Sequence, residues 1–347
     1  MMKRLAAAVA VALAFAAPAA QAASITGAGA TFPAPVYSKW AEAYAQHTGT
    51  TLNYQAIGSG GGIKQIKAKT VDFGASDKPL KPEDLDAAGL MQFPMVMGGV
   101  VPVMNLPGIA PGQIKLAGTQ LADIYRGVIR TWDDPLIKLT NKGVNLPHMP
   151  ITVVHRSDGS GTSFLFTSYL AMKAPHWASD VGASDSVQWP TGVGGKGNDG
   201  VAALVKQTPG SIGYVEYAYA RQNGMTYALM QNKAGKFVAP TAPAFAAAAA
   251  GADWSKAPGY YLLLLDQQGA ASWPITGATF ILVYKKQDNP AAGREVLKFF
   301  DWAYKNGDTM AQQLDYVPMP AKVKDMVRKA WMKQVAGADG KVVYASR

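Results

Sequence analysis

The chain has 347 residues and a formal net charge of +10, and this length suits one large domain or two medium domains. It contains no cysteine, which excludes disulfides, thiolate metal sites and a lipid-modified N-terminal cysteine. The 33 basic residues are scattered, without a Lys/Arg-rich stripe interleaved with aromatic residues. The charge therefore does not indicate nucleic-acid binding, although it would raise the local concentration of small anions.

Residues 1–22 have the features of a secretory leader. Lys3 and Arg4 precede an apolar, alanine-rich segment at 5–17, and a small-x-small cleavage signal ends at Ala22. The apolar segment is too short to remain as a membrane anchor. The placement of the charges and the cleavage signal also argues against a buried N-terminal helix. We therefore predict a signal peptide over 1–22 and export of the mature chain.

Three stretches share one pattern, in which a strand runs into a loop of small residues and then into a helix. The first loop ends with Thr31 and Phe32, just before a helix that opens with prolines. In the second stretch, a strand over 51–57 leads to a glycine-rich loop that carries Ser59, and a helix follows over 63–69. The first N–H groups of a helix have no partner within it, so each loop is a candidate anion contact.

The third stretch combines such a helix start with a permanent positive charge. An apolar strand over 151–154 runs into Arg156 and a small-residue loop, and a helix follows over 164–172. Arg156 offers a planar donor fork that suits oxyanions, and Asp158 can hold that fork in place. Gly161 allows close approach of a ligand to the backbone, and further donors are the hydroxyls of Ser160, Thr162 and Ser163. The alternative is an ordinary capped helix beside a surface arginine.

The remaining segments complete an alternating order of strands and helices. A short strand over 71–77 ends in Asp77, and the apolar runs at 91–104 and 275–284 suit buried strands that cross between two lobes. The other predicted elements are a strand at 212–219 and helices at 83–88, 119–126, 198–207, 242–252, 290–306 and 320–335. We expect capping residues to open the helices at 119 and 198, and the alanine-rich helix at 242–252 to be exposed.

This order predicts an α/β fold with largely parallel strand pairing. In such sheets, ligands bind beyond the carboxyl ends of the strands. The three loops all follow strands and precede helices, so we expect them to converge on one cleft together with Asp77.

Motifs that would indicate other functions are incomplete. Gly194–Gly197 lacks the spacing and the Lys-Ser/Thr pair of a phosphate-binding P-loop, and we interpret it as a turn. Ser59 and Ser160 both lack the glycine two residues earlier that a nucleophile elbow requires. The four histidines show no metal-ligand spacing, and His155 is expected to be structural. We predict no catalytic residue, no cofactor and no metal site.

The mature chain closely resembles the periplasmic phosphate-binding proteins of phosphate-specific ABC transporters. The segments that carry the likeness are 24–40, 54–80, 153–170, 194–220 and 299–304. The resemblance implies the two-lobed periplasmic binding protein fold of type II, in which each lobe is a mostly parallel sheet flanked by helices. Phosphate would be buried in the cleft between lobe 1, at 23–101 plus 275–347, and lobe 2, at 102–274.

Position by position, the resemblance also implies which residues contact phosphate. They are Thr31, Phe32, Ser59, Asp77, Arg156, Ser160, Gly161 and Thr162. Asp77 would act as a hydrogen-bond acceptor, and Asp158 would steady the arginine. The chain departs from the family at Gly60, where a second serine is frequent. We expect this change to remove a side-chain hydrogen bond and to leave the backbone N–H in place.

The sequence thus predicts a periplasmic protein that captures inorganic phosphate by lobe closure and delivers it to the membrane permease subunits of an ABC importer, without spanning the membrane itself. One alternative is a phosphatase, although the sequence supplies neither a nucleophile paired with a base nor metal ligands. Another is a binder of sulfate or molybdate. Asp77 argues against this second alternative, because an ionised carboxylate accepts a hydrogen bond from protonated phosphate but repels sulfate.

Overall fold

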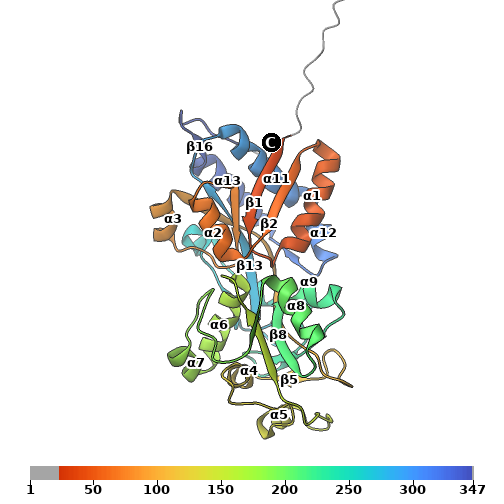
Figure 1. Cartoon of the computed structure of the whole chain (residues 1–347). Helices are drawn as coiled ribbons and strands as arrows, with labels where there is room; N and C mark the ends of the chain where they lie inside the picture. The colour runs from red at the N-terminus through yellow and green to blue at the C-terminus, as the bar shows by residue number, and fades with distance from the viewer. Residues whose placement is uncertain (1–22, 346–347) are drawn as a thin grey trace, which may run out of the picture.

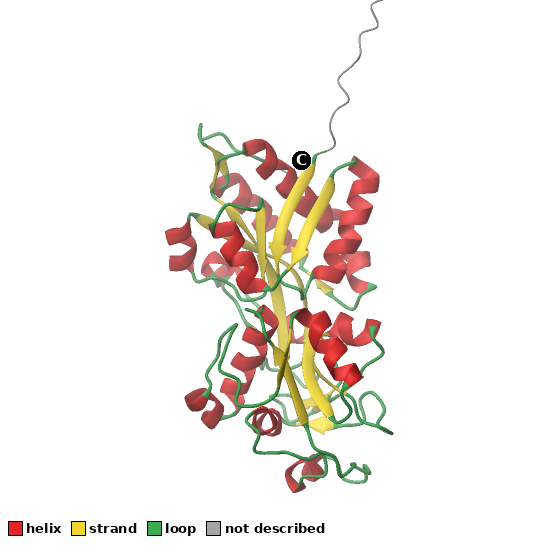
Figure 2. Cartoon of the chain, viewed as in Figure 1, coloured by secondary structure: helices red, strands yellow, loops and turns green. Residues whose placement is uncertain are grey.

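The structure, a computed structural model, describes residues 23–345, so the predicted leader over 1–22 lies outside the described residues. Two bodies of mixed strands and helices lie one above the other, with β13 passing between them (Figure 1). Strands run through the middle of both bodies and helices surround them (Figure 2). The predicted two-lobed α/β fold is confirmed, and we refer to the body that contains β1 as lobe 1 and the body that contains β8 as lobe 2.

One sheet links the two lobes. Its strand order is β2 (Thr51–Ala56), β1 (Ser24–Gly29), β3 (Phe73–Ser76), β13 (Ile275–Tyr284), β4 (Leu90–Met104), β8 (Ser211–Glu216), β6 (Thr152–Arg156) and β7 (Val193–Gly195). β1 pairs in parallel with β2 and β3, and β6 pairs in parallel with β7 and β8. β4 and β13 are antiparallel, because the chain leaves lobe 1 along β4 and returns along β13. Parallel pairing therefore holds within each lobe but not for the crossing strands.

The crossing strand β4 pairs first with β13 and then, towards its end, with β8. Gly98 and Gly99 lie where it changes partner, and aromatic rings pack directly on both. A Cβ added to Gly98 would lie 3.0 Å from the ring of Phe32, and one added to Gly99 would lie 2.1 Å from the ring of Phe245. Since neighbouring residues of a strand face opposite sides, the two glycines make room for a ring on each face of β4.

The long helices bury their apolar faces against this sheet. Helix α1 (Ala34–Thr48) buries Tyr37 and Trp40, and the Tyr37 ring meets Phe300 of α11 edge to face, with 6.1 Å between the ring centroids. Helix α11 (Pro290–Asn306) has its predicted bounds, and α13 (Ala321–Gln334) lies within the predicted range. The helical spacing of apolar residues was a sufficient signal for these elements because one face of each is buried.

Helix α2 (Ser59–Lys67) begins at Ser59 rather than at residue 63, so the glycines predicted to form a loop are helical. Glycine weakens an isolated helix, but here it allows close packing. A Cβ on Gly62 would lie 2.5 Å from the Cα of Gly29 and 2.8 Å from the carbonyl oxygen of Ala75. The glycines therefore let α2 pack directly on β1 and β3.

Three further sequence predictions were wrong in detail. Thr119 and Asn198 do not cap their helices, since α4 (Gly118–Tyr125) and α8 (Gly197–Gln207) begin earlier, after Ala117 and Lys196. The strand predicted to run to residue 219 ends at residue 216, where α9 (Tyr217–Gln222) follows. Helix α10 (Ala242–Ala249) is not simply exposed, because it buries Phe245 against β4.

The other elements are short, apart from α6, which opens at the third loop. They are α3 (Pro82–Ala88), β5 (Lys115–Leu116), α5 (Pro135–Thr140), α6 (Gly161–Lys173), α7 (Pro175–Asp180), β9 (Thr226–Tyr227), β10 (Leu229–Gln231), β11 (Phe237–Val238), η1 (Trp254–Lys256), η2 (Pro258–Tyr260), β12 (Leu264–Leu265), β14 (Lys286–Gln287), α12 (Asp308–Gln312), β15 (Val317–Pro318) and β16 (Ala336–Gly337). Within residues 23–345, none of the helices combines the length and apolar character needed to cross a membrane.

The lobe boundaries near residues 101 and 274 stay a prediction. One segment of the predicted second lobe packs on lobe 1. The side chain of Gln92 in β4 donates to the carbonyl oxygen of Gly259 in η2, at 2.8 Å. Trp254 of η1 and Tyr260 of η2 border a cavity that Leu85 of α3 also lines. The chain between α10 and β13 thus lies beside lobe 1 before it enters the return crossing.

We expect Gly99→Ala to lower the free energy of unfolding by about 1–3 kcal/mol, because the added methyl group would overlap the Phe245 ring. Gly251→Ala is the matched control, since nothing lies within 4 Å of a Cβ at that position. It should change the free energy by no more than about 0.5 kcal/mol. Chemical denaturation of the two variants measures both effects, and equal stability of Gly99→Ala and the parent would contradict the close packing on β4.

Candidate functional site

The three strand–loop–helix stretches meet between the lobes, below α2 and above α6 and α8 in Figure 1. The N–H of Gly60 donates to the carbonyl oxygen of Gly159, at 2.9 Å. A Cβ on Gly161 would lie 2.4 Å from Ser59 Oγ and 2.7 Å from Asp77 Oδ2. The predicted contact residues with side chains are all at most 3% exposed, namely Thr31, Phe32, Ser59, Asp77, Arg156, Ser160 and Thr162. The structure therefore brings the loops and Asp77 together in one buried site.

Arg156, at the end of β6, places a permanent positive charge in this site. Its Nε donates to Asp158 Oδ1 at 2.8 Å, and its Nη2 donates to Asp158 Oδ2 at 2.5 Å. Burial raises the pKa of Asp158, but the Arg156 guanidinium outweighs this effect and holds that pKa below its usual value. The buried Nη1 of Arg156 has no hydrogen-bond partner among the described residues. Asp158 thus fixes the fork as expected and leaves one donor nitrogen for a ligand.

Asp77, directly after β3, supplies the opposite kind of group. Its N–H donates to Ser59 Oγ at 3.1 Å, and that hydroxyl lies 3.4 Å from Asp77 Oδ2. Its buried Oδ1 has no hydrogen-bond partner in the described part of the chain. Burial raises the pKa of Asp77 to about 7, against the opposing effects of the Thr279 hydroxyl, the Arg156 charge and the Ser59 hydroxyl. The site therefore offers a free buried acceptor as well as donors.

The start of α6 contributes Ser160, Gly161 and Thr162. Ser160 is the N-cap, since its Oγ accepts from the N–H of Ser163 at 3.0 Å, and its own hydroxyl proton remains available. The hydroxyl of Ser163 instead pairs with the Tyr214 hydroxyl at 2.6 Å, so this side chain is held by lobe 2. Helix N-termini of this kind favour anions through their free N–H groups and their dipole.

Phe32 and Gly60 are held beside the site by hydrogen bonds of their backbone atoms. The Phe32 ring packs on Gly98 and Tyr316, and its carbonyl oxygen accepts from the Tyr316 hydroxyl at 2.6 Å, so only its backbone N–H can face a ligand. The backbone N–H of Gly60, which the change to glycine was expected to leave in place, donates to the carbonyl oxygen of Gly159. A Cβ on Gly60 would lie 3.2 Å from the Cα of Gly159, so the two loops approach closely there because both lack side chains.

Sequence reasoning missed Asn198, which is fully buried at the start of α8. Its Nδ2 donates to Thr31 Oγ1 at 2.8 Å and to Thr162 Oγ1 at 3.2 Å. The available signal was the stretch Gly194–Gly197, which we interpreted as a turn. It is the end of β7 and the start of α8, and so a fourth strand-to-helix connection.

An ion pair also joins the two lobes next to the site. Lys78 Nζ lies 2.7 Å from Asp185 Oδ1, and the backbone carbonyl of Asp185 accepts from the N–H of Ser160 at 2.9 Å. The side chains of Lys78 and Asp185 are 33% and 21% exposed. Because they are partly solvated, their attraction is modest, and the pair marks the solvent edge of the site.

His155 is structural, as predicted. Its ring stacks on Trp189 with 4.8 Å between the ring centroids, and its Nδ1 lies 3.1 Å from the carbonyl oxygen of Arg156. Burial lowers the pKa of His155, which favours a neutral ring. It faces away from the hydroxyls and Asp77 because alternate residues of β6 face opposite sides.

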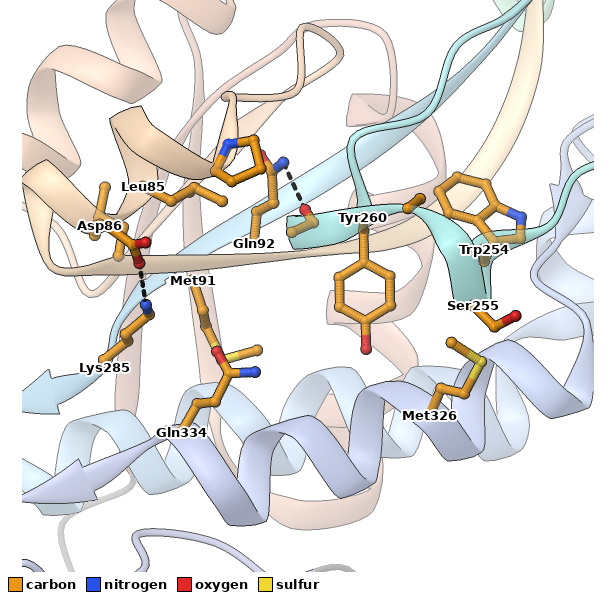
Figure 3. A pocket seen from close by; sticks show the side chains of 14 residues that line it. Leu85, Asp86, Met91, Gln92, Trp254, Ser255, Tyr260, Lys285, Met326 and Gln334 are labelled. Carbon is orange, nitrogen blue, oxygen red and sulfur yellow. Dashed lines mark hydrogen bonds and ion pairs between the residues drawn. The ribbon is translucent and has the colours of Figure 1, made fainter.

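A cavity of about 340 Å³ lies in lobe 1 between α3, β4, η2 and α13 (Figure 3). Leu85, Met91 and Met326 give it apolar walls, and its cation, Lys285, is already paired with Asp86 at 2.6 Å. The predicted contact residues do not line it. Its lining does not suit an anion, so the lobe junction is the candidate site.

We expect Asp77 to lower the stability of the phosphate-free protein as the pH rises from about 4 to about 7. Burial raises the pKa of Asp77 from 3.8 to about 7, so over this range the folded protein keeps a proton that the unfolded chain releases. The free energy of unfolding should fall on the order of 1 kcal/mol per pH unit from this group alone. Asp77→Asn should remove this contribution, and chemical denaturation of both proteins across the range measures the difference. An identical pH dependence of the two proteins would contradict the raised pKa.

Comparison with known proteins gives concordant results. The family model of the PBP superfamily domain matches residues 16–306. The chain is 53% identical over 324 residues to the phosphate-binding protein PstS of Pasteurella multocida, which covers 93% of this chain and 94% of that protein. It is 53% identical over 318 residues to PstS of Haemophilus influenzae, with 92% and 95% covered.

The fold is similar to a solved high-affinity periplasmic phosphate-binding protein bound with phosphate. The TM-score is 0.73 and the identity 21%, with 92% of this chain and 96% of that chain covered. At this identity the likeness shows a common fold, and the family follows from the closely related sequences. This chain belongs to the PstS family of phosphate-binding proteins, within the PBP superfamily.

Proposed function

We propose that this protein captures inorganic phosphate between its two lobes and delivers it to an ABC importer. The observation that carries the proposal is the pairing of two buried, unpartnered polar atoms in one site. Arg156 Nη1 can donate to an oxyanion, and Asp77 Oδ1 can accept from an oxyanion that carries a proton. Phosphate near neutral pH needs both kinds of partner. The names of the PstS relatives support the same ligand.

The site offers enough interactions for tight binding. A micromolar Kd corresponds to about −8 kcal/mol, and charge-assisted hydrogen bonds contribute about 1.5–3 kcal/mol each. The guanidinium, the N-terminal N–H groups of α6 and the hydroxyls of Ser160 and Thr162 are donors of this kind. Several such bonds reach that affinity after the costs of desolvation and lobe closure.

Capture is proposed to occur by lobe closure. Thr31, Ser59 and Asp77 belong to lobe 1, whereas Arg156 and the start of α6 belong to lobe 2. The structure has the lobes in contact, through the Gly60–Gly159 hydrogen bond and the Lys78–Asp185 ion pair. A ligand that bonds to both lobes stabilises this closed state by its differential affinity.

We propose binding and not catalysis, with the mature protein in the periplasm. A phosphatase would need a nucleophile beside a general base or a metal. Ser160 Oγ accepts from the helix start, and Ser59 Oγ accepts from the N–H of Asp77 and lies 3.4 Å from Asp77 Oδ2, at the long limit of a hydrogen bond. The imidazole of His155, the histidine nearest in sequence, stacks on Trp189 instead. The relatives support this view, because they are named as binding proteins.

Isothermal titration calorimetry with phosphate, sulfate and an organic phosphate tests the proposal. The parent protein should bind phosphate and neither of the others. Arg156→Ala should weaken phosphate binding at least tenfold, because removing one partner of a buried charged pair costs about 2–5 kcal/mol. Arg328→Ala is the matched control, since Arg328 also donates to an aspartate, Asp301, at 2.6 Å, but lies in α13. An unchanged Kd for Arg156→Ala would remove this residue from the site, and no phosphate binding by the parent would overturn the function.

Asp77→Asn should admit sulfate. Sulfate carries no proton at neutral pH, so its oxygens face the ionised form of the Asp77 carboxylate as like charges, whereas an asparagine amide can donate to them. A site that pairs a ligand hydroxyl can reject an analogue lacking it by about 10⁴–10⁵. We expect measurable sulfate binding by the variant, with substantial phosphate binding retained. A variant that excludes sulfate as strongly as the parent does would show that selectivity arises elsewhere in the cleft.

A further inference from the structure

We propose that Asn198 is a positioning residue that commits the hydroxyls of Thr31 and Thr162 to donate to the bound anion. The inference rests on the proposed function, and it assigns a role to a residue that the sequence motifs did not indicate. Asn198 touches a hydroxyl from each lobe, because Thr31 lies in the first loop and Thr162 in the first turn of α6.

The orientation of the Asn198 amide is fixed by its own partners. The side chain is fully buried, and its Oδ1 accepts from the backbone N–H of Glu216 at 3.0 Å. A backbone N–H can only donate, so the oxygen of the amide must face Glu216 and the nitrogen must face the two threonines. The amide therefore acts only as a donor towards Thr31 and Thr162.

The hydroxyl of Thr31 is consequently left with only its proton free to form a hydrogen bond. A hydroxyl has one proton to donate and two lone pairs that accept. Thr31 Oγ1 receives the backbone N–H of Asn198 at 3.2 Å and the side-chain Nδ2 at 2.8 Å. Both lone pairs are then engaged, and the proton remains for another acceptor.

Thr162 receives the same amide nitrogen from the other side. Its Oγ1 accepts from Asn198 Nδ2 at 3.2 Å, which leaves its proton free as well. A fully ionised oxyanion face has only acceptor atoms, so a hydroxyl contributes to its binding only as a donor. By filling lone pairs on both hydroxyls, Asn198 orients two donors towards the anion in the closed state.

The same contacts link this orientation to lobe closure. Asn198 and Thr162 lie in lobe 2, and Thr31 lies in lobe 1, where its carbonyl oxygen also accepts from the Tyr219 hydroxyl at 2.6 Å. The bridge from Asn198 to Thr31 therefore exists only when the lobes meet. Burial raises the pKa of the adjacent Glu216 well above its usual value, which reduces the repulsion between this carboxyl and an anion.

A double-mutant cycle on the whole exported protein tests the proposal. Phosphate Kd is measured by calorimetry for Asn198→Ala in the parent and in the Thr31→Val, Thr162→Val background. We expect Asn198→Ala to weaken binding about tenfold or more in the parent, since hydrogen bonds to a charged group are lost. In the background without hydroxyls, the same substitution should change Kd by less than about threefold, because residues that act as a unit are not additive.

Further variants separate positioning from packing. Asn198→Asp keeps the shape of the side chain, so it serves in the same cycle if Asn198→Ala fails to fold. Any direct repulsion from the new carboxylate is common to both backgrounds and cancels in the cycle. Asn232→Ala is the matched control, because Asn232 is also buried but donates to the carbonyl oxygens of Gly269 and Ser272, away from the site. It should lower stability and leave phosphate Kd unchanged within about twofold.

The outcomes distinguish a failure of the positioning role of Asn198 from a failure of the proposed phosphate-binding function. Equal effects of the Asn198 substitutions with and without the threonine hydroxyls would overturn the positioning role and leave phosphate binding intact. Weakening by Asn232→Ala as large as that by Asn198→Ala would also overturn it, because general destabilisation would then explain both. A parent protein that does not bind phosphate would overturn the proposed function and the inference together.

Discussion

The burial of one permanent charge, the Arg156 guanidinium, constrains everything around the lobe junction. Removing such an ion from water costs several kcal/mol unless partners are provided. Asp158 provides them on one side through two hydrogen bonds, and Gly197 steadies that carboxylate with its N–H at 3.1 Å. The nitrogen that remains without a protein partner is complementary to an anion. The charge thus makes the closed site a stable arrangement chiefly when a ligand completes it.

Selectivity follows from the opposite group in the same site. Asp77 brings a buried carboxyl whose pKa of about 7 lets it lose or keep a proton close to neutral pH. When the carboxyl is ionised, an oxyanion with its own proton can donate that proton to it, and an oxyanion without a proton is repelled. Arg156 and Asp77 therefore act together, because the first sets the charge of the ligand and the second sets its state of protonation.

Close approach of backbone segments is the second requirement of this site. Gly161 has Ser59 and Asp77 within van der Waals distance of where its side chain would lie, and Gly62 abuts Gly29. Gly98 and Gly99 likewise have no side chain, and aromatic rings from both lobes pack on them in the crossing strand β4. Absent side chains thus allow the loops of two lobes to surround a small ion and exclude water from it.

The sequence alone was sufficient for the features that depend on local pattern. Alternating strands and helices, the strand-to-helix connections at Thr31, Ser59 and Ser160, and the fork of Arg156 with Asp158 all involve neighbouring residues, whose spacing reports their geometry. The tertiary structure decided the rest. Asn198 meets Thr31 across 167 positions, Tyr219 meets it across 188, and Tyr316 meets Phe32 across 284. No local pattern signals such contacts, because a hydrogen bond between distant segments is set by how the lobes close and not by which residues are adjacent.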